Sequence, residues 1–112
     1  MKTILAFVRP HKLEEVKSAL ALLPISGMTI RDARGTGDNP EEPVTFMGQA
    51  MVVTMPMRSA VEVVVPDDLA DDVVSAIKEA AWTGAPGDGK IFIEPVVEAI
   101  RVRTLERGDD AL

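Results

Sequence analysis

Residues 58–97 read RSAVEVVV PDDLADDVVSAIKEAAW TGAPGDG KIFIEPVV, and this stretch decides the fold. Residues 58–65 are rich in β-branched side chains and predict a strand. The next segment predicts a helix that begins near Asp67, whose carboxylate would cap it. The apolar stripe of this helix consists of Leu69, Val73, Ile77 and Ala80. Residues 83–89 are turn formers, and residues 90–97 predict a further strand.

The N-terminal half of the chain repeats this order. Residues 3–9 predict a strand that Pro10 ends, and residues 12–23 predict a helix that Pro24 ends. The apolar residues of this helix recur at helical spacing, at Leu13, Val16, Leu20 and Leu23. Residues 25–34 then predict a second strand. Two strand–helix–strand units predict an α+β fold, a ferredoxin-like βαββαβ sandwich in which a four-stranded antiparallel sheet carries two helices on one face.

The length of the chain indicates a single domain spanning residues 1–112. Three regions lie outside its predicted regular elements: the long loop (residues 35–57), the glycine loop (residues 82–90) and the C-terminal segment (residues 99–112). The long loop contains several glycines and prolines, so we expect little regular structure in it. A segment of about 20 residues of this kind is uncommon in a compact domain and is usually functional.

The composition argues against several classes of function. The chain has no cysteine and one histidine, which excludes disulfides and disfavours a transition-metal centre or a histidine base. Its net charge of −6 argues against a nucleic-acid partner. No apolar run approaches the roughly 18 residues of a membrane span and no export signal is recognisable, so we expect a cytoplasmic protein without membrane insertion. Residues 3–9 and 58–65 are apolar on both faces of their strands, which favours covering the open face by self-association.

Gly87, Asp88, Gly89 and Lys90 form the most informative motif. Glycines let the backbone approach a ligand closely, successive N–H groups form a concave anion site, and a lysine adds positive charge. Phosphate binding is one interpretation of the motif. The other, which the spacing alone leaves open, is a plain turn. The motif is not a Walker loop, because no strand-to-helix element of the form Gly-x4-Gly-Lys-Thr/Ser is present.

Two further places could contact a ligand. Arg101 and Arg103 would lie on the same side of an extended chain, where they could grip phosphate oxygens or simply be solvated. Gly35, Thr36 and Gly37, at the root of the long loop, could contact a ligand or act only as a hinge.

The same residues carry a resemblance to a known family. The stretch Thr83–Ile93, with its Gly-Asp-Gly-Lys centre, resembles the C-terminal signature of the PII signal-transduction proteins, the nitrogen regulatory proteins. Other stretches are similar to the family in the same order along the whole chain, namely Val8–Leu13, Gly27–Thr29, Val64–Asp67 and Arg101–Thr104. The chain is therefore identified as a PII-like protein that diverges in the long loop.

The resemblance implies a homotrimer that binds an adenine nucleotide (ADP, ATP or AMP) in the clefts between its subunits. It implies that the phosphates are surrounded by Gly87, Asp88, Gly89 and Lys90, and reached across the subunit boundary by Arg101 and Arg103. It implies that the adenosine is framed by Thr29, Gly35, Gly37, Glu62 and Val64, with Thr36 and Asp38 completing the contacts. The long loop would dock on a target protein, either an enzyme or a membrane transporter.

The long loop departs from the family pattern at positions of covalent control. Met51 stands where uridylylated relatives carry a tyrosine, and Gln49 stands where some carry a phosphorylated serine. Covalent control at these positions should therefore be absent. Met47 stands near an arginine with which relatives plug ammonium channels.

Ligand sensing should differ as well. Relatives that bind 2-oxoglutarate with magnesium use a glutamine where this chain has Asn39 and a lysine where it has Arg58, so we expect weak or no 2-oxoglutarate binding. Asp38 replaces a phosphate-facing arginine, and its negative charge would repel a third phosphate. We therefore expect ADP or AMP to bind at least as well as ATP. Whether Mg²⁺, bicarbonate or another small anion accompanies the nucleotide is left open.

Two alternatives stand beside the regulator. A small acylphosphatase-like enzyme on the same fold could use Asp88 and Lys90, but no nucleophile–base pair is evident. A trimeric metal-tolerance or scaffold protein would also fit the fold, although one histidine and no cysteine disfavour metal binding. We predict a regulatory protein that is not an enzyme, with a target that the sequence does not identify.

Overall fold

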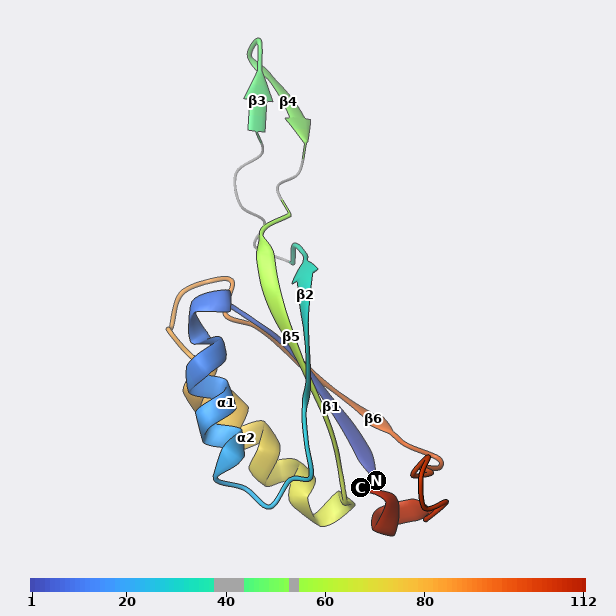
Figure 1. Cartoon of the computed structure of the whole chain (residues 1–112). Helices are drawn as coiled ribbons and strands as arrows, with labels where there is room; N and C mark the ends of the chain where they lie inside the picture. Colours follow the sequence, from blue (N-terminus) through green and yellow to red (C-terminus); the bar gives the residue numbers. More distant parts are fainter. Residues whose placement is uncertain (38–43, 53–54) are drawn as a thin grey trace.

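The computed structural model describes residues 1–37, 44–52 and 55–112. Its main sheet has the strand order β2-β5-β1-β6, and every neighbouring pair is antiparallel (Figure 1). The four strands are β1 (Lys2–Val8), β2 (Thr29–Arg34), β5 (Met57–Val65) and β6 (Gly89–Pro95). With the two helices between them, they confirm the predicted ferredoxin-like fold.

Both helices lie on the same side of the sheet (Figure 1). A 3-10 turn, η1 (Pro10–Lys12), leads into α1 (Leu13–Ala21), and a second, η2 (Asp67–Leu69), leads into α2 (Ala70–Ala81). The helical residues that are buried lie on one stripe of each helix: Val16 and Leu20 on α1, and Ala70, Val73, Ile77 and Ala81 on α2. The predicted stripe of the second helix was therefore right at Val73 and Ile77, while Leu69 and Ala80 pack against the core only partly buried and their neighbours Ala70 and Ala81 are buried.

Asp67 does not cap the second helix, so that prediction was wrong. The N-cap of η2 is Pro66 and that of α2 is Leu69, and neither makes a side-chain cap hydrogen bond. The Asp67 carboxylate instead lies 2.8 Å from the Met1 amino group. A hydrogen bond from this ammonium group lowers the pKa of Asp67. A full positive charge holds a carboxylate more strongly than a neutral backbone amide does, which explains why Asp67 pairs with the Met1 amino group and does not cap the helix.

The two faces of the sheet differ in their surroundings. Ile4 on β1 is paired with Val63 and Ile93 in the neighbouring strands, and this face is packed against the helices. On the opposite face, Phe7 and Phe92 meet edge to face with ring centroids 6.2 Å apart. Phe92 is still 46% exposed. The open face therefore carries an aromatic pair, but it is not apolar throughout, because Glu62 opposite Leu5 and Lys90 opposite Phe7 share it. The helices leave this face uncovered (Figure 1).

Part of the long loop has regular structure, contrary to expectation. β3 (Val44–Phe46) and β4 (Gln49–Val52) form an antiparallel hairpin. The two residues between these strands, Met47 and Gly48, have φ angles of 54° and 79°, the left-handed backbone that tight hairpin turns require. Figure 1 shows this hairpin projecting beyond the end of the main sheet. The base of the long loop is closed by the Gly35 N–H, which donates to the Pro56 carbonyl oxygen at 3.1 Å.

None of the helices in the described ranges is long and apolar enough to cross a membrane.

Candidate functional site

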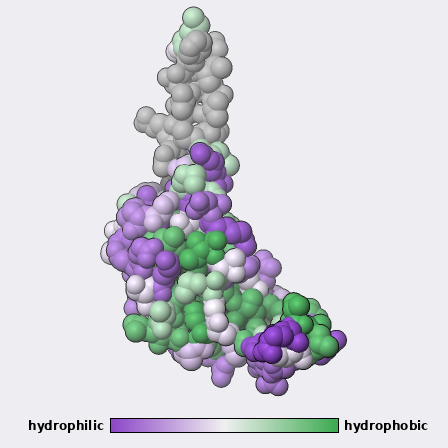
Figure 2. Space-filling view, in the orientation of Figure 1, coloured by the Kyte–Doolittle hydropathy of each residue, from purple (hydrophilic) through white to green (hydrophobic). Residues whose placement is uncertain are grey.

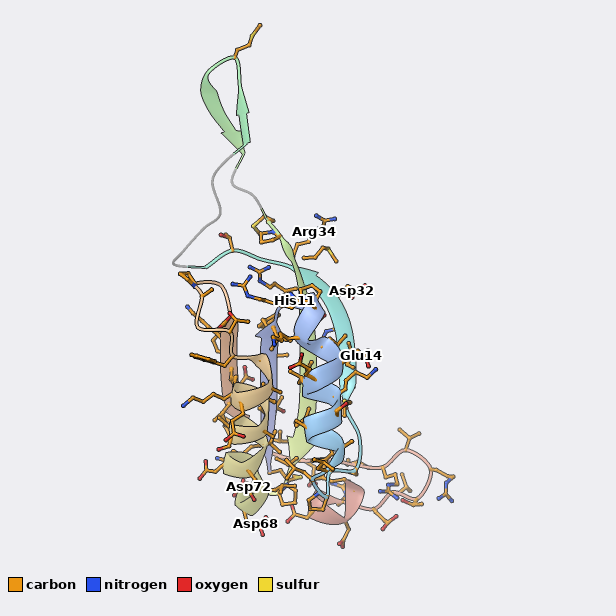
Figure 3. All side chains as sticks on the ribbon, turned by 90° about the vertical axis from the view of Figure 1, so that its left-hand side faces the viewer. His11, Glu14, Asp32, Arg34, Asp68 and Asp72 are labelled. Atoms are coloured by element: carbon orange, nitrogen blue, oxygen red, sulfur yellow. The ribbon has the colours of Figure 1, made fainter. Side chains whose placement is uncertain are left out.

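A pocket of about 610 Å³ lies where the long loop leaves the sheet. One wall is the end of β2 and the start of the long loop, and the opposite wall is the glycine loop. The lining residues are Phe7, Ala33, Arg34, Gly35, Thr36, Gly37, Pro56, Arg58, Ala85, Gly87, Asp88, Gly89, Lys90 and Phe92. Figure 3 places Arg34 at the base of the long loop, with His11 below it at the start of the first helix. The pocket thus joins segments that are about 50 residues apart in sequence.

The glycine loop is held in shape by the carboxylate of Asp88. Its Oδ2 accepts the backbone N–H groups of Thr83 at 2.8 Å and Gly84 at 3.0 Å. Its Oδ1 accepts the Thr83 hydroxyl, and Arg9 Nε at 3.2 Å. The Thr83 hydroxyl oxygen in turn accepts the Ala85 N–H at 3.2 Å. Asp88 therefore closes the loop on itself and ties it to the end of β1.

These hydrogen bonds change the acidity of Asp88. Donation by the Thr83 hydroxyl is the largest influence, followed by the backbone N–H of Thr83, and together with Gly84 and Arg9 they hold the pKa of Asp88 far below its usual range. The carboxylate is therefore ionised at any physiological pH. Its oxygens accept hydrogen bonds from Thr83, Gly84 and Arg9 of the same chain.

Two glycines let the loop approach its neighbours. Gly87 and Gly89 have φ angles of 98° and 110°, which side chains rarely adopt. A Cβ atom on Gly89 would lie 1.7 Å from the Phe7 carbonyl oxygen in the adjacent strand. A Cβ atom on Gly87 would lie 3.0 Å from Arg9 Nη2 and 3.7 Å from Arg58 Nη2. Gly89 therefore requires glycine for steric reasons, whereas at Gly87 the positive φ angle favours glycine and the neighbouring arginine side chains could shift.

The pocket has the electrostatic character of an anion site. Among the described residues that line it, three carry positive charge (Arg34, Arg58 and Lys90) and one is a carboxylate, Asp88, whose oxygens accept hydrogen bonds from the loop and from Arg9. This local excess contrasts with the net charge of −6 of the whole chain. Guanidinium and ammonium groups beside glycine backbone are suited to phosphate oxygens, and the two phenylalanines offer apolar surface for a flat group.

The family profile of the nitrogen regulatory protein P-II matches residues 1–106 of this chain. The chain belongs to the P-II family. It is 43% identical to the nitrogen regulatory protein P-II of Azospirillum brasilense and 44% identical to that of Haemophilus influenzae, over the full length of each protein. It is also 43% identical to the nitrogen regulatory protein GlnK2 of Haloferax mediterranei, over the whole of this chain and 91% of that protein.

P-II proteins are signalling regulators rather than enzymes, and this confirms the predicted class of function. The acylphosphatase-like enzyme and the metal-tolerance or scaffold protein are therefore set aside as alternatives. The resemblance stated from the sequence is likewise confirmed, since the match is collinear and nearly complete.

In this P-II chain, seven of the residues predicted to contact a ligand line the pocket: Gly35, Thr36, Gly37, Gly87, Asp88, Gly89 and Lys90. Thr29, Glu62 and Val64 do not line it. Thr29 and Glu62 are register partners on β2 and β5, and Glu62 lies 3.6 Å from Arg31. Their assignment to an adenosine site stays a prediction. Asp38 and Asn39 lie outside the described residues.

Arg101 and Arg103 lie away from the pocket of their own chain. Figure 1 shows the C-terminal segment near the N-terminus, at the end of the sheet opposite the hairpin. The expected extended conformation was wrong, because residues 102–104 form a turn in which the Leu105 N–H donates to the Arg101 carbonyl oxygen at 2.8 Å. The Arg101 guanidinium donates to the Leu112 carbonyl oxygen at 2.9 Å.

The C-terminal segment and the residues before it expose large apolar side chains. Val97 is 97% exposed, Val102 93% and Leu105 71%. Figure 2 shows this apolar surface beside strongly hydrophilic surface on the same segment. Exposure of this extent in one chain is typical of a surface that another protein covers.

Sequence reasoning missed two residues that organise the site. Arg9 was quoted only as part of the family's opening, and Thr83 only as the start of the signature, yet both bind Asp88. Trp82, which follows the last residue of α2, is 66% exposed. Its ring lies over Gly84, where a Cβ atom would come within 3.0 Å of it.

Proposed function

We propose that this P-II protein binds an adenine nucleotide in the pocket between the glycine loop and the root of the long loop. The nucleotide is ADP, AMP or ATP, and the long loop changes its docking on a target enzyme or membrane transporter in the cytoplasm according to the nucleotide bound. Such control needs only unequal affinity of the nucleotide for two states of the loop.

One observation carries the proposal: a glycine loop that is fixed by Asp88 and ends at Lys90 lines one pocket together with Arg34 and Arg58. Its volume of about 610 Å³ lies within the roughly 300–1,000 Å³ of small-molecule sites. The pocket also adjoins the long loop, because residues 35–37 belong to both. A ligand there would touch the base of the segment that is proposed to dock on targets.

The assembly in this proposal is a homotrimer. Exposed apolar side chains on the open face of the sheet, such as Phe92, and in the C-terminal segment, such as Val102 and Leu105, would be covered by self-association. In a trimer, Arg101 and Arg103 of one subunit would approach the pocket of the next, which fits their distance from the pocket of their own chain. Light scattering gives the mass of the assembly, and a monomer would contradict this arrangement.

We expect the Lys90→Ala variant to bind ADP about tenfold more weakly than the wild type, the loss typical of one charge-assisted contact. Isothermal titration with ADP, AMP and ATP measures it. Lys17→Ala is the matched control, because Lys17 lies on α1, pairs with Glu14 at 3.1 Å and does not line the pocket. A wild-type protein that binds none of the three nucleotides at millimolar concentration would overturn the proposed function.

We expect ADP or AMP to bind at least as well as ATP, and 2-oxoglutarate to produce no heat with ATP and Mg²⁺ present. The preference among nucleotides follows from the carboxylate of Asp38, which repels a third phosphate. The absence of 2-oxoglutarate binding follows from Asn39 and Arg58, which replace the glutamine and the lysine of relatives that bind it. The same titrations with and without Mg²⁺ test both. Much tighter binding of ATP, or a clear 2-oxoglutarate signal, would show that the divergent positions do not set selectivity.

Uridylylation plays no part in this control, because Met51 offers no hydroxyl group. A pull-down compared between ADP and ATP would identify a partner whose binding depends on the nucleotide.

A further inference from the structure

Arg9 joins two parts of the molecule that are far apart in sequence. It follows the end of β1, and its Nε donates to Asp88 Oδ1 at 3.2 Å. Its Nη2 donates to the carbonyl oxygen of Pro86 at 2.5 Å. Its side chain is 22% exposed, and Arg9 does not line the pocket. One guanidinium group therefore holds the glycine loop at two points without lining the pocket.

We propose that Arg9 is a positioning residue for anion binding, acting through the Pro86–Gly87 peptide. This inference rests on the proposed function, since it concerns how the same pocket takes a nucleotide phosphate. Arg9 itself does not touch the ligand. It determines where the backbone N–H of Gly87 points.

The argument follows from the geometry of a trans peptide, in which the carbonyl and the following N–H point in opposite directions. No cis peptide occurs among the described residues. Because the Pro86 carbonyl points to Arg9, the Gly87 N–H points away from Arg9. Gly87 lines the pocket and Arg9 does not, so the N–H is turned to the side where an anion would bind.

The chemistry of the side chain suits this task. A guanidinium group is a rigid planar fork, so its Nε and Nη2 can hold the Asp88 carboxylate and the Pro86 carbonyl at a fixed separation. A lysine ammonium on a flexible stem can keep the ion pair but does not impose this separation. The missing Cβ of Gly87, which would lie 3.0 Å from Arg9 Nη2, is what lets the guanidinium approach so closely.

Titration of ADP into the full-length protein tests the inference. We expect Arg9→Met to weaken ADP binding at least about tenfold, the loss typical of removing charge-assisted hydrogen bonds. Arg9→Lys should fall between this variant and the wild type, and it carries the test if Arg9→Met does not fold. Lys12→Met is the matched control, expected to stay close to the wild type. Lys12 has a similar side-chain exposure of 21%, pairs with Glu15 and does not line the pocket.

A spectroscopic readout separates loop positioning from loss of a distant charge. Trp82 is the sole tryptophan and lies over Gly84 of the glycine loop, so its emission reports on the shape of the loop. We expect the emission of ligand-free Arg9→Met to differ from that of the wild type, and that of Lys12→Met to be unchanged. In an Asp88→Asn background, Arg9→Met should have much less additional effect on ADP affinity, because both residues act through one network.

The outcomes distinguish the two proposals. If the wild type binds ADP and Arg9→Met binds it equally well, the positioning role is overturned and the proposed function stands. Fully additive losses in the double variant, or unchanged Trp82 emission in Arg9→Met, would also overturn the positioning role. A wild type that binds no adenine nucleotide overturns the proposed function, and this inference with it.

Discussion

The Gly89→Ala variant is expected to lose at least about 3 kcal/mol of unfolding free energy, because the added methyl group collides with main chain and not with a movable side chain. Its Cβ would lie 1.7 Å from the Phe7 carbonyl oxygen, and Gly89 has a φ angle of 110°. Gly89 is paired with Val8 where β6 begins. Relief of the collision would require β6 to move away from β1 at the edge of the pocket.

Urea unfolding followed by circular dichroism measures this loss. Gly27→Ala is the control, since nothing lies within 4 Å of a Cβ there and its φ is not in the left-handed region. We expect that control to stay within about 0.5 kcal/mol of the wild type. Equal unfolding midpoints for Gly89→Ala and the wild type would mean that the close approach of β6 to Phe7 is not a feature of the native protein.

Removal of the Asp88 carboxylate should have the largest effect on ligand binding. In Asp88→Ala, the N–H groups of Thr83 and Gly84, the Thr83 hydroxyl and Arg9 all lose their shared acceptor. We expect ADP affinity to fall about 100-fold, because a displacement of binding groups by about 1 Å can cost that much. The fold should persist, since Asp88 lies outside the hydrophobic core.

Titration calorimetry measures the loss, and Asp72→Ala provides the control. Asp72 lies at the start of α2, at the end of the molecule away from Arg34 and the pocket (Figure 3). If Asp88→Ala bound ADP as tightly as Asp72→Ala does, the loop would not need its carboxylate to present backbone to an anion.

The same network predicts a response to acid. The pKa of Asp88 is lower in the folded protein than its ordinary value of 3.8, so its stabilising contribution is present above that value and is lost only as the pH falls through the lowered pKa. The Trp82 emission of the ligand-free protein should therefore stay constant from neutral pH down to about pH 4. A change centred near the ordinary carboxyl value would contradict the lowered pKa.

The order of the elements could be predicted because apolar spacing marks each one, but the start of β2 could not. The predicted strand began at Ile25, whereas β2 begins at Thr29. Ile25 and Met28 pack against the core without joining the sheet. Apolar character reports burial, and burial does not require pairing with another strand. The hairpin in the long loop was missed because its turn carries no typical sequence signal. The first turn residue is a methionine, Met47, which adopts the left-handed backbone conformation.

In the site, the residues of the glycine loop were found because they form a local motif. Arg9 was not, because its partner Asp88 is 79 residues away and no local pattern marks the pairing. The C-terminal segment was misjudged for a related reason. Its turn places Leu105 at a φ of 63°, a conformation that sequence signals through glycine or asparagine and that here is set by hydrogen bonds within the segment.

The hydrogen bond from the Gly35 N–H to the Pro56 carbonyl oxygen brings the two ends of the long loop together. Because the two ends of the long loop meet there, the sequence between them can be replaced or lengthened while the β2–β5 ladder keeps its register. Each doubling of a loop's length costs only about 0.6 kcal/mol in closure entropy. The segment is therefore a natural graft site, at which evolution or an engineer can exchange the loop sequence while the scaffold keeps its stability.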